Sequence, residues 1–312
     1  MKNSAGRLEG TRMGDNPPMP PSIDVVIATY NAPPDRLERS VRSGLAIEGV
    51  RSVIVVDDGS PTPADLERLR RLSEKVQTHR QDNAGPGSAR NAGLDRSVAD
   101  LVIFVDDDDE LLPEGVGAMT ALVQRLGVSV CVAGRMHIWP GVREEPRPVP
   151  PEWADRRLDH PSHVLRPIGL FGASGAMVTR GVIDRGIRFD TQLRLGEDRD
   201  FLHKAAQVGG IAVSSAFANR VEMHAEGGAN LSSRGHYAKR IRDHVTLLER
   251  YGDPVAVMHM EAATRWLINA AAKSEVDEES WKVLVGAARS RGWSVPMKAR
   301  ARWWLRRGLF RR

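Results

Sequence analysis

The feature of this sequence that most constrains its fold is an apolar run that leads directly into a run of acids. Leu101–Val105 is apolar and mostly β-branched or aromatic, and residues 106–110 read Asp-Asp-Asp-Asp-Glu. An apolar run of this length predicts a strand in the buried centre of a sheet. Because buried carboxylates are costly unless a cation neutralises them, we expect the chain to leave the core at Asp106.

The acidic run has two interpretations. In an open α/β sheet, ligands bind at the carboxyl ends of the strands. Hard cations such as Mg²⁺ or Mn²⁺ take oxygen ligands and often share them with substrate phosphates. Asp106 and Asp108 are therefore candidates for the metal end of a phosphate site. Alternatively, the acids begin a helix, where negative charge suits the helix dipole. The rest of the chain favours the first interpretation.

Several further segments have the pattern of buried strands. They are Ile23–Ala28, Ser52–Val56, residues 76–80, Val128–Ile138 and Ile211–Ala218. Helical periodicity fills most of the intervals between them, including Leu66–Val76 and, from Pro113 to about Leu126, the interval after the central strand. This alternation predicts an α/β fold with a mostly parallel, three-layer sheet. The Pro-rich, polar segment Pro140–Pro151 predicts a loop.

The chain divides into three parts. Residues 1–21 lack the apolar segment of a signal peptide, and we expect them to be disordered. Residues 22–235 carry the α/β pattern, and residues 236–312 predict a helical extension with a basic tail. No run is long and apolar enough to span a bilayer. The single cysteine, Cys131, cannot form an internal disulfide, which fits a reducing cytoplasm.

A glycine-rich segment, Asn83–Gly93, precedes the central strand. Its glycines indicate a tight loop that opens into a helix. No stretch after the first strand completes G-x-G-x-x-G, which disfavours a dinucleotide oxidoreductase. Two predicted strands end in Asp pairs, at Asp57-Asp58 and at Asp106-Asp107. Together with the glycine-rich loop that opens into a helix, they indicate a nucleotide-diphosphate site.

Five motifs in order resemble those of glycosyltransferase family 2. They are Val26-Ile-Ala-Thr-Tyr-Asn31, Val55-Val-Asp-Asp-Gly-Ser60, Asn83-Ala-Gly85 with Ala89-Arg-Asn-Ala-Gly93, Phe104-Val-Asp-Asp-Asp108 and Gly196-Glu-Asp198. Each motif alone is weak, whereas the ordered set is specific. The resemblance implies the GT-A nucleotide-diphospho-sugar transferase fold, with residues 22–235 as its catalytic domain.

The resemblance assigns nucleotide binding to Ala28, Tyr30, Asp58, Arg90 and Asp106. Asp58 would accept a hydrogen bond from a base N–H, and Tyr30 would stack on the ring. Alternatively, Tyr30 only packs against the first helix. Arg90 would orient Asp58 or the ribose, or else it is a solvated charge.

The resemblance also implies a Mn²⁺ or Mg²⁺ ion at Asp106 and Asp108. Asp108 would ligate the ion directly, and Asp106 would hold the ribose or a metal-bound water. Since the residue between them is also acidic, Asp107 and Asp109 are the competing pair. His224, beyond the last strand, would contact the metal or the diphosphate, or else it is structural.

Asp198 matches the catalytic base of the family, and Glu197 would position the acceptor or Asp198 itself. An inverting transferase needs a carboxylate that removes the proton of the acceptor hydroxyl as its oxygen attacks the anomeric carbon. The metal would stabilise the charge that builds on the diphosphate. Alternatively, both acids merely begin a helix. Ser174 and Gly175 fit a turn that lines the donor-sugar or acceptor pocket.

The C-terminal segment Lys298–Arg312 is basic and contains Trp303 and Trp304. Aromatic and basic residues together on a terminal helix suit an anionic membrane surface. The alternative is a helix that docks both tryptophans on the protein and leaves the arginines in solvent.

These features together predict an inverting, metal-dependent glycosyltransferase. It would move a sugar from a nucleoside diphosphate sugar, with a UDP-sugar favoured, to a hydroxyl of a glycan, a lipid-linked saccharide or a small molecule. The expected setting is cell-envelope polysaccharide, glycolipid or natural-product glycosylation, in the cytoplasm or at the inner face of the membrane. The alternatives are a catalytically silent binding protein of the same fold and a nucleotidylyltransferase. The net charge is +5, but the basic segment is short and terminal, so we expect no nucleic-acid partner.

Overall fold

A single ten-stranded sheet organises the protein. The structure, a computed structural model, describes residues 20–139, 141–166, 170–223, 237–274 and 276–309. The strand order is β3-β2-β1-β4-β9-β6-β10-β5, with β7 paired to β6 and β8 paired to β10. The strands are β1 Ile23–Thr29, β2 Val50–Asp58, β3 Val76–Gln81, β4 Leu101–Asp106, β5 Glu110–Leu111, β6 Val130–Trp139, β7 Arg143–Arg147, β8 Arg156–Arg157, β9 Met177–Thr179 and β10 Ile211–Glu222.

Most long strands of this sheet run in one direction. β3, β2, β1 and β4 pair in parallel, and so do β6 and β10. The short strand β9 pairs antiparallel with both β4 and β6, so it joins the two parallel parts while keeping their common direction. The predicted mostly parallel sheet is confirmed, with β9 inserted against the general direction.

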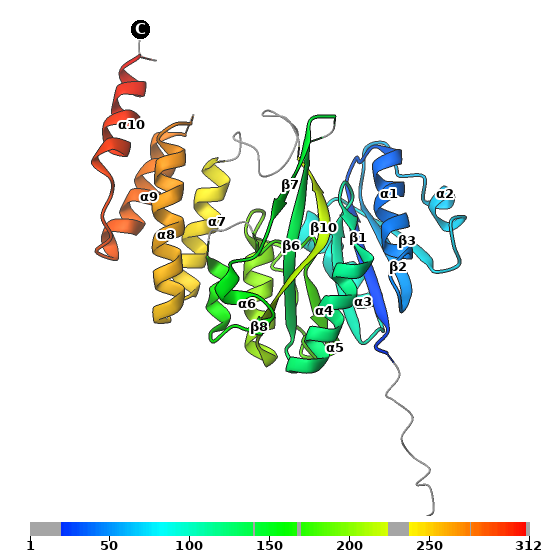
Figure 1. Cartoon of the computed structure of the whole chain (residues 1–312). Helices are drawn as coiled ribbons and strands as arrows, with labels where there is room; N and C mark the ends of the chain where they lie inside the picture. The colour runs from blue at the N-terminus through cyan, green and yellow to red at the C-terminus, as the bar shows by residue number, and fades with distance from the viewer. Residues whose placement is uncertain (1–19, 140, 167–169, 224–236, 275, 310–312) are drawn as a thin grey trace, which may run out of the picture.

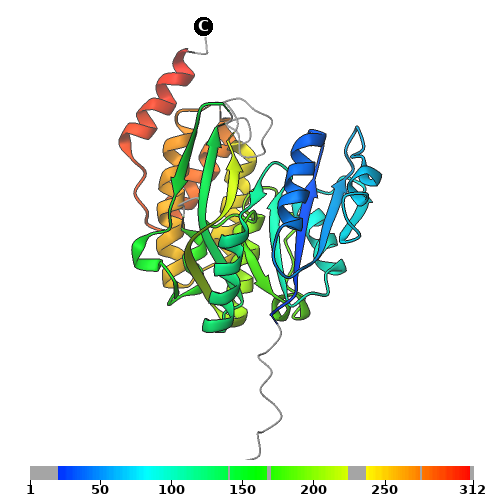
Figure 2. The same cartoon turned by 45° about the vertical axis from the view of Figure 1, so that its right-hand side comes forward.

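Helices cover both faces of the sheet and make it the middle of three layers (Figure 1, Figure 2). The helices of this part are α1 Pro34–Leu45, α2 Leu66–Arg70, α3 Pro86–Arg96, α4 Pro113–Leu126, α5 Arg180–Asp184 and α6 Glu197–Gly209, with 3-10 turns η1 Pro151–Trp153 and η2 Pro161–Leu165. Val41 of α1 and Met119 of α4 belong to the apolar core on one face. Leu94 of α3 and Phe201 of α6 belong to the core on the other face.

The register of the central strands brings their carboxyl ends to one level. β1 lies between β2 and β4, and it pairs Thr29 with Asp57 and Ala28 with Asp106. The apolar part of β4, residues 102–105, is at most 1% exposed, whereas Asp106 is partly exposed. The chain leaves the core at Asp106 because its carboxylate cannot share that apolar interior.

Four further helices form the C-terminal extension. They are α7 Tyr237–Arg250, α8 Pro254–Ala271, α9 Glu278–Ser290 and α10 Met297–Leu309, and they lie beside one end of the sheet (Figure 1). Asp253 and Asp277 cap α8 and α9 by accepting hydrogen bonds from the backbone N–H groups of Ala256 and Ser280. Among the helices that the structure describes, none has both the length and the apolar character needed to cross a membrane.

The segment predicted as a loop contains an edge strand. β7 pairs antiparallel with β6, and Pro146 lies opposite Met136. Proline has no N–H to donate, so it is tolerated only where a strand has a free edge. The Pro-rich, polar composition of Pro140–Pro151 therefore favoured a loop in the sequence analysis. The same composition is also compatible with an edge strand, which is what the structure contains.

Candidate active site

The carboxyl end of β2 is fixed by its own two aspartates. Asp57 is fully buried, accepts hydrogen bonds from Ser60 N (3.0 Å) and Ser60 Oγ (2.5 Å), and pairs with Arg80. Burial alone would raise the pKa of Asp57, but the hydrogen bonds from Ser60 and Ala64 and the charge of Arg80 hold it below its usual value. Asp57 is thus an anion that holds the turn after β2.

Asp58 fastens the glycine-rich loop to the end of β2. Its carboxylate accepts hydrogen bonds from Ala84 N (2.9 Å), Gly85 N (2.8 Å) and Gln81 Nε2 (2.8 Å). Gly85 has φ +94°, a conformation that L side chains rarely adopt, and a Cβ there would lie 3.2 Å from Arg194 Nη1. The loop therefore enters α3 in one defined conformation close to the strand ends.

The four aspartates at the end of β4 have different surroundings. Asp106, Asp107 and Asp108 are partly exposed. Asp107 Oδ2 accepts a hydrogen bond from Tyr30 N (3.2 Å) at the end of β1. Asp109 is 3% exposed and accepts hydrogen bonds from Ser174 Oγ (2.5 Å) and from a backbone N–H at the end of β10 (3.1 Å).

Electrostatic repulsion accumulates in this run. Burial, together with the charges of Asp108 and Asp106, raises the pKa of Asp107 to about 6. Burial and the same two neighbours raise the pKa of Asp109 well above its usual range. Burial and this repulsion therefore disfavour a charge on Asp109 more than on its neighbours at the site.

Arg90 connects the acidic run to the start of α6. Its guanidinium is buried and lies 2.9 Å from Asp106 Oδ1 and 3.1 Å from Glu197 Oε1. Burial disfavours its charge, yet Asp106 and Glu197 raise the pKa of Arg90 overall. The sequence interpretation had Arg90 orient Asp58 or the ribose; in the structure its carboxylate partners are Asp106 and Glu197.

Three aromatic rings set the position of α6 beneath this connection. Phe189 and Phe201 stack with centroids 3.9 Å apart, and Phe104 of β4 contacts both rings edge-on at 5.3 and 5.7 Å. The Arg90 guanidinium lies 5.5 Å from the centroid of Phe189. This packing fixes the first turn of α6, and with it Glu197, relative to β4.

Glu197 and Asp198 begin α6 after Gly196. Burial, and then repulsion from Asp198, raises the pKa of Glu197 to about 7, although Arg90 opposes the shift. Asp198 is less buried, and its Oδ1 accepts a hydrogen bond from Arg199 N (2.7 Å). Asp198 also borders the segment before β9, because a Cβ on Gly172 would lie 3.5 Å from Asp198 Oδ2.

Arg135 of β6 is a site residue that the sequence interpretation missed. Its Nη2 donates hydrogen bonds to Leu170 O (3.0 Å) and Ser174 O (3.0 Å), which holds the turn before β9. Burial lowers the pKa of Arg135, and the charges of Asp109, Asp106 and Asp198 oppose this shift. The available signal was a lone arginine that interrupts the apolar run 128–138.

The structure thus gathers most of the residues expected at the site. Asp106, Arg90 and Glu197 form one connected group, and Asp198 adjoins it. Ala28 is half-buried beside Asp106, Tyr30 is 51% exposed, and Asp58 holds the glycine-rich loop. His224 lies outside the described residues.

The donor atoms present fit a hard cation. Asp106 and Asp108 offer carboxylate oxygens, and Mg²⁺ or Mn²⁺ commonly completes its shell with water and substrate phosphate. Within the described ranges, no group of three or more His, Cys, Asp or Glu side chains is arranged to hold a metal by itself. Among the described residues, the two carboxylates would leave most of the coordination shell to water and substrate phosphate.

The whole structure is similar to solved structures of S. aureus TarS. TarS 1-349 in complex with UDP-GlcNAc superposes with a TM-score of 0.61 over 90% of this chain and 83% of that chain, at 20% sequence identity. TarS 1-349 without that ligand gives a TM-score of 0.58 over 86% and 91%, at 17% identity. The fold is therefore the GT-A fold, as the sequence motifs predicted.

The sequence also matches a protein family. Residues 24–186 match the family model described as Glycosyl transferase family 2. This range covers more than half of the chain, and it contains the ends of β1, β2 and β4 together with the glycine-rich loop. The chain belongs to glycosyl transferase family 2.

Curated relatives cover parts of the chain. The succinoglycan biosynthesis protein ExoO of Rhizobium meliloti is 29% identical over 209 residues, which is 61% of this chain and 57% of the relative. ExoW of the same organism is 41% identical over 101 residues, 30% and 31% of the two chains. The GalNAc(5)-diNAcBac-PP-undecaprenol beta-1,3-glucosyltransferase of Campylobacter jejuni is 30% identical over 116 residues, 34% of each. The chain thus spans 57% or less of these three relatives.

Proposed function

We propose that this protein is an inverting, metal-dependent glycosyltransferase that moves a sugar from a nucleoside diphosphate sugar to an acceptor hydroxyl. The observation that carries the proposal is the buried Arg90, which binds Asp106 on the nucleotide side and Glu197 on the acceptor side. An arginine that bridges two carboxylates so far apart in sequence fixes their spacing. Transfer requires such fixed spacing between donor and acceptor.

The nucleotide would lie across the carboxyl ends of β1, β2 and β4. Tyr30 is exposed there and offers a ring face to the base. Asp58 Oδ2 accepts one hydrogen bond from Gly85 N, and a carboxylate oxygen can accept a second from a base N–H. Ala28 leaves room for the ligand between these groups.

Asp106 and Asp108 would hold the Mn²⁺ or Mg²⁺ ion that offsets charge on the diphosphate leaving group. The burial of Asp109 supports this pair over the alternative register, since Asp106, Asp107 and Asp108 are all partly exposed. Asp109 is buried with both carboxylate oxygens hydrogen-bonded, and Asp107 is bonded to the end of β1. His224 remains a candidate third contact for the ion or the diphosphate.

Asp198 would act as the general base. It would remove the proton from the acceptor hydroxyl while that oxygen attacks the anomeric carbon from the side opposite the diphosphate. Glu197, held by Arg90 and with a pKa raised to about 7, would position Asp198 and the acceptor rather than take the proton. Arg135 and the turn containing Ser174 and Gly175 would line the acceptor side.

The comparisons support the choice of partners. A fold neighbour is solved with UDP-GlcNAc and with UDP, which favours a UDP-sugar donor. One relative is named for transfer to an undecaprenol-linked saccharide, and two are named for succinoglycan biosynthesis. We therefore propose envelope polysaccharide or lipid-linked glycan synthesis at the cytoplasmic face of the membrane.

The proposal is tested by product analysis with Mn²⁺ and a panel of nucleotide sugars. Transfer releases free nucleoside diphosphate, whereas a nucleotidylyltransferase releases pyrophosphate. Asp198→Asn should lower turnover by on the order of a thousandfold, because it removes the base, while donor binding persists. Asp184→Asn, an exposed acid at the end of α5, is the matched control. Donor binding without any turnover in the wild type would identify a silent binding protein instead.

A further inference from the structure

The last helix, α10, is attached to the protein by a narrow stripe. Among residues 297–306, only Ala299 and Trp303 are buried. The Trp303 ring stacks on Trp281 of α9, with centroids 5.1 Å apart and planes 8° apart. These two residues are four apart and lie on one face, so the opposite face of α10 points away from the protein.

The outward face of α10 is apolar. Met297, Trp304 and Leu305 are 82%, 62% and 67% exposed, and Ala301 is also exposed. At about 100° per residue these four positions lie on the side opposite the Ala299–Trp303 stripe. The structure therefore separates the two neighbouring tryptophans, since Trp303 docks inward and Trp304 faces outward.

Cations border this apolar face on both sides. Lys298 and Arg302 lie along one border and Arg300 lies on the other, while Arg306 follows one turn later, nearer the docked stripe; all four are exposed. Residues 297–312 contain seven Lys and Arg and no Asp or Glu. The border therefore has a single sign of charge.

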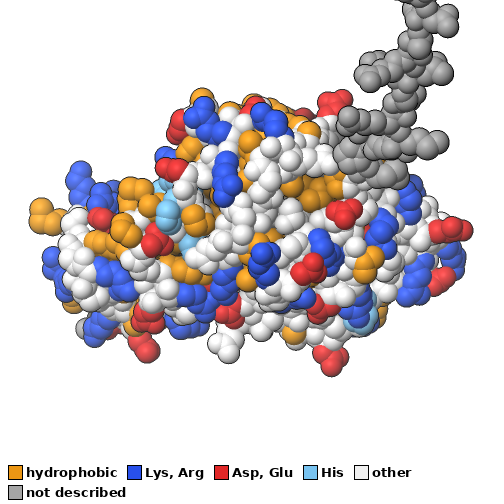
Figure 3. All heavy atoms as spheres, turned by 90° about the horizontal axis from the view of Figure 1, so that it is seen from below, with side chains coloured by type: hydrophobic (Ala, Val, Ile, Leu, Met, Phe, Trp, Pro, Cys, Tyr) orange, Lys and Arg blue, Asp and Glu red, His pale blue; other side chains and the backbone are white. Residues whose placement is uncertain are grey.

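The position of α10 leaves this surface open. α10 lies at the end of the molecule farthest from the N-terminal strands, beyond α8 and α9 (Figure 1). Seen from below, hydrophobic side chains are exposed among charged ones at the end of the molecule that carries the helical extension (Figure 3).

We propose that the outward face of α10 docks on an anionic phospholipid surface. Trp304 and Leu305 would enter the boundary between headgroups and acyl chains, where tryptophan is favoured. The flanking cations would contact the headgroups. A helix with an apolar face, cationic borders and no acids has the composition of interfacial helices. The inference does not depend on the proposed glycosyl transfer.

A vesicle-binding experiment tests the proposal on the full chain. The probes are vesicles of phosphatidylcholine with about 30 mol % phosphatidylglycerol and vesicles of phosphatidylcholine alone, and binding is measured by co-sedimentation at low salt. The wild type should bind the anionic vesicles at least about tenfold more strongly. Trp304→Ala with Leu305→Ala should weaken that binding by on the order of tenfold or more. Lys298→Gln with Arg302→Gln should do the same and reduce its salt dependence.

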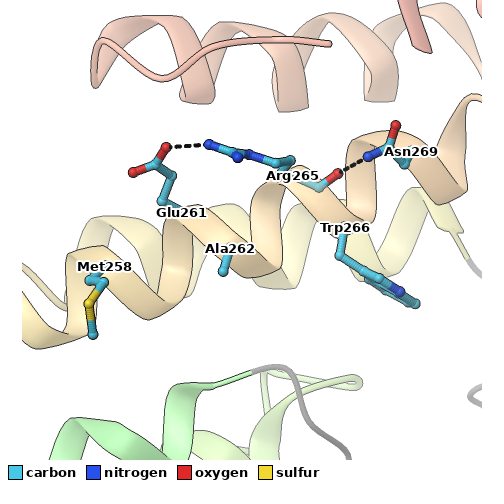
Figure 4. Close-up of a pocket in the computed structure, with 6 residues that line it drawn as sticks. All are labelled: Met258, Glu261, Ala262, Arg265, Trp266 and Asn269. Atoms are coloured by element: carbon cyan, nitrogen blue, oxygen red, sulfur yellow. Dashed lines mark hydrogen bonds and ion pairs between the residues drawn. The ribbon is translucent and has the colours of Figure 1, made fainter. Parts of the chain in front are cut away.

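The matched control is Trp266→Ala on α8. Trp266 is 53% exposed, but its helix also carries the Glu261–Arg265 ion pair (2.9 Å), which lies on the other side of α8 from the Trp266 ring (Figure 4). Unlike α10, this helix therefore does not have cations alone beside its exposed tryptophan. This variant should bind the vesicles like the wild type.

Three results would overturn the proposal. They are equal binding to both vesicle types, unchanged binding of the Trp304/Leu305 variant, and an equal loss in Trp266→Ala. Binding of duplex DNA in place of vesicles, unaffected by the Trp304/Leu305 change, would also overturn it. That result would show that the cations of α10 bind a nucleic acid and not phospholipid headgroups. The altered residues are exposed, so thermal unfolding should match that of the wild type and exclude misfolding as the cause.

Discussion

At the scale of single residues, identical side chains in sequence acquire different chemistry from distant partners. Asp106 is paired by a residue 16 positions away, whereas Asp109 is bonded to the N–H of Glu222, 113 positions away. The acidic run was visible in the sequence, because five acids after an apolar strand are a local pattern. The burial of Asp109 could not be predicted, since its partners belong to the β9 turn and to β10.

The first prediction separates two aspartates in the run. Asp108→Ala should abolish the Mn²⁺-dependent stabilisation of the protein by a donor nucleotide and lower kcat/KM by on the order of a hundredfold. Asp109→Asn should retain the Mn²⁺ dependence, because Asp109 is buried with both carboxylate oxygens hydrogen-bonded to the protein. Thermal shift with and without Mn²⁺ checks both variants. The reverse pattern would assign the ion to the Asp107/Asp109 register.

The second prediction concerns the pH dependence of stability at Glu197. Its pKa is raised from 4.5 to about 7, so between these values the folded chain keeps a proton that the unfolded chain releases. Its contribution to the free energy of unfolding is therefore present at low pH and is lost as the pH rises toward 7 and above. From about pH 5 to pH 8, the wild type should lose roughly 1–3 kcal/mol relative to Glu197→Gln. Urea unfolding at both pH values measures this, and equal slopes for both proteins would contradict the assignment.

At the scale of helices and strands, sequence patterns predicted the elements whose formation depends mainly on their own residues. The apolar runs located β1, β4 and β6, and the helix at Pro113–Leu126 has the predicted bounds. The periodicity of Leu66–Val76 predicted a longer helix than α2, which ends at Arg70. The strand β7 was missed because its stability comes from pairing with β6 and not from its own composition.

The third prediction uses two glycines in one helix. A Cβ on Gly115 of α4 would lie 2.0 Å from the backbone oxygen of Phe217 in β10, whereas a Cβ on Gly117 would meet nothing within 4 Å. Gly115→Ala should therefore lower the free energy of unfolding by about 1–3 kcal/mol or more, because the helix must move away from the sheet. Gly117→Ala should raise it by about 0.5–1 kcal/mol through helix propensity. Chemical denaturation of both variants checks the pair, and similar effects would refute this close packing of α4 on β10.

At the scale of the whole molecule, the helical extension shares a core with the α/β part. Leu247, Leu248 and Met260 belong to the same apolar cluster as the sheet and α6. The buried Asp200 of α6 accepts hydrogen bonds from Arg250 (2.5 Å) and from Tyr251. The boundary near residue 236 is a change of pattern in the sequence, and the sequence carries no sign of this joint packing.

The fourth prediction follows from that shared core. Removal of residues 237–312 should destabilise the α/β part by at least about 3–5 kcal/mol, because the apolar surface covered by Leu247, Leu248 and Met260 becomes exposed and Asp200 loses two hydrogen-bond partners. Removal of residues 297–312 should leave the urea midpoint of the main transition within about 0.5 M of the full chain, because Ala299 and Trp303 of α10 belong to the apolar cluster of the extension. The folded fraction and the urea midpoint of each truncated chain measure the difference. A fully stable chain ending at residue 236 would show that the extension is an independent unit.

The antiparallel strand β9 has a consequence for how the protein is made. Met177 and Val178 fill the position between β4 and β6, so neither of those strands has its final neighbour until the ribosome has synthesised residue 179. Until then the nascent chain carries β4 as an open edge, the kind of edge that invites pairing with other chains. The two parallel parts of the sheet can join only after this three-residue strand has emerged from the ribosome. Slow or incorrect pairing of β9 would therefore expose the nascent chain to aggregation.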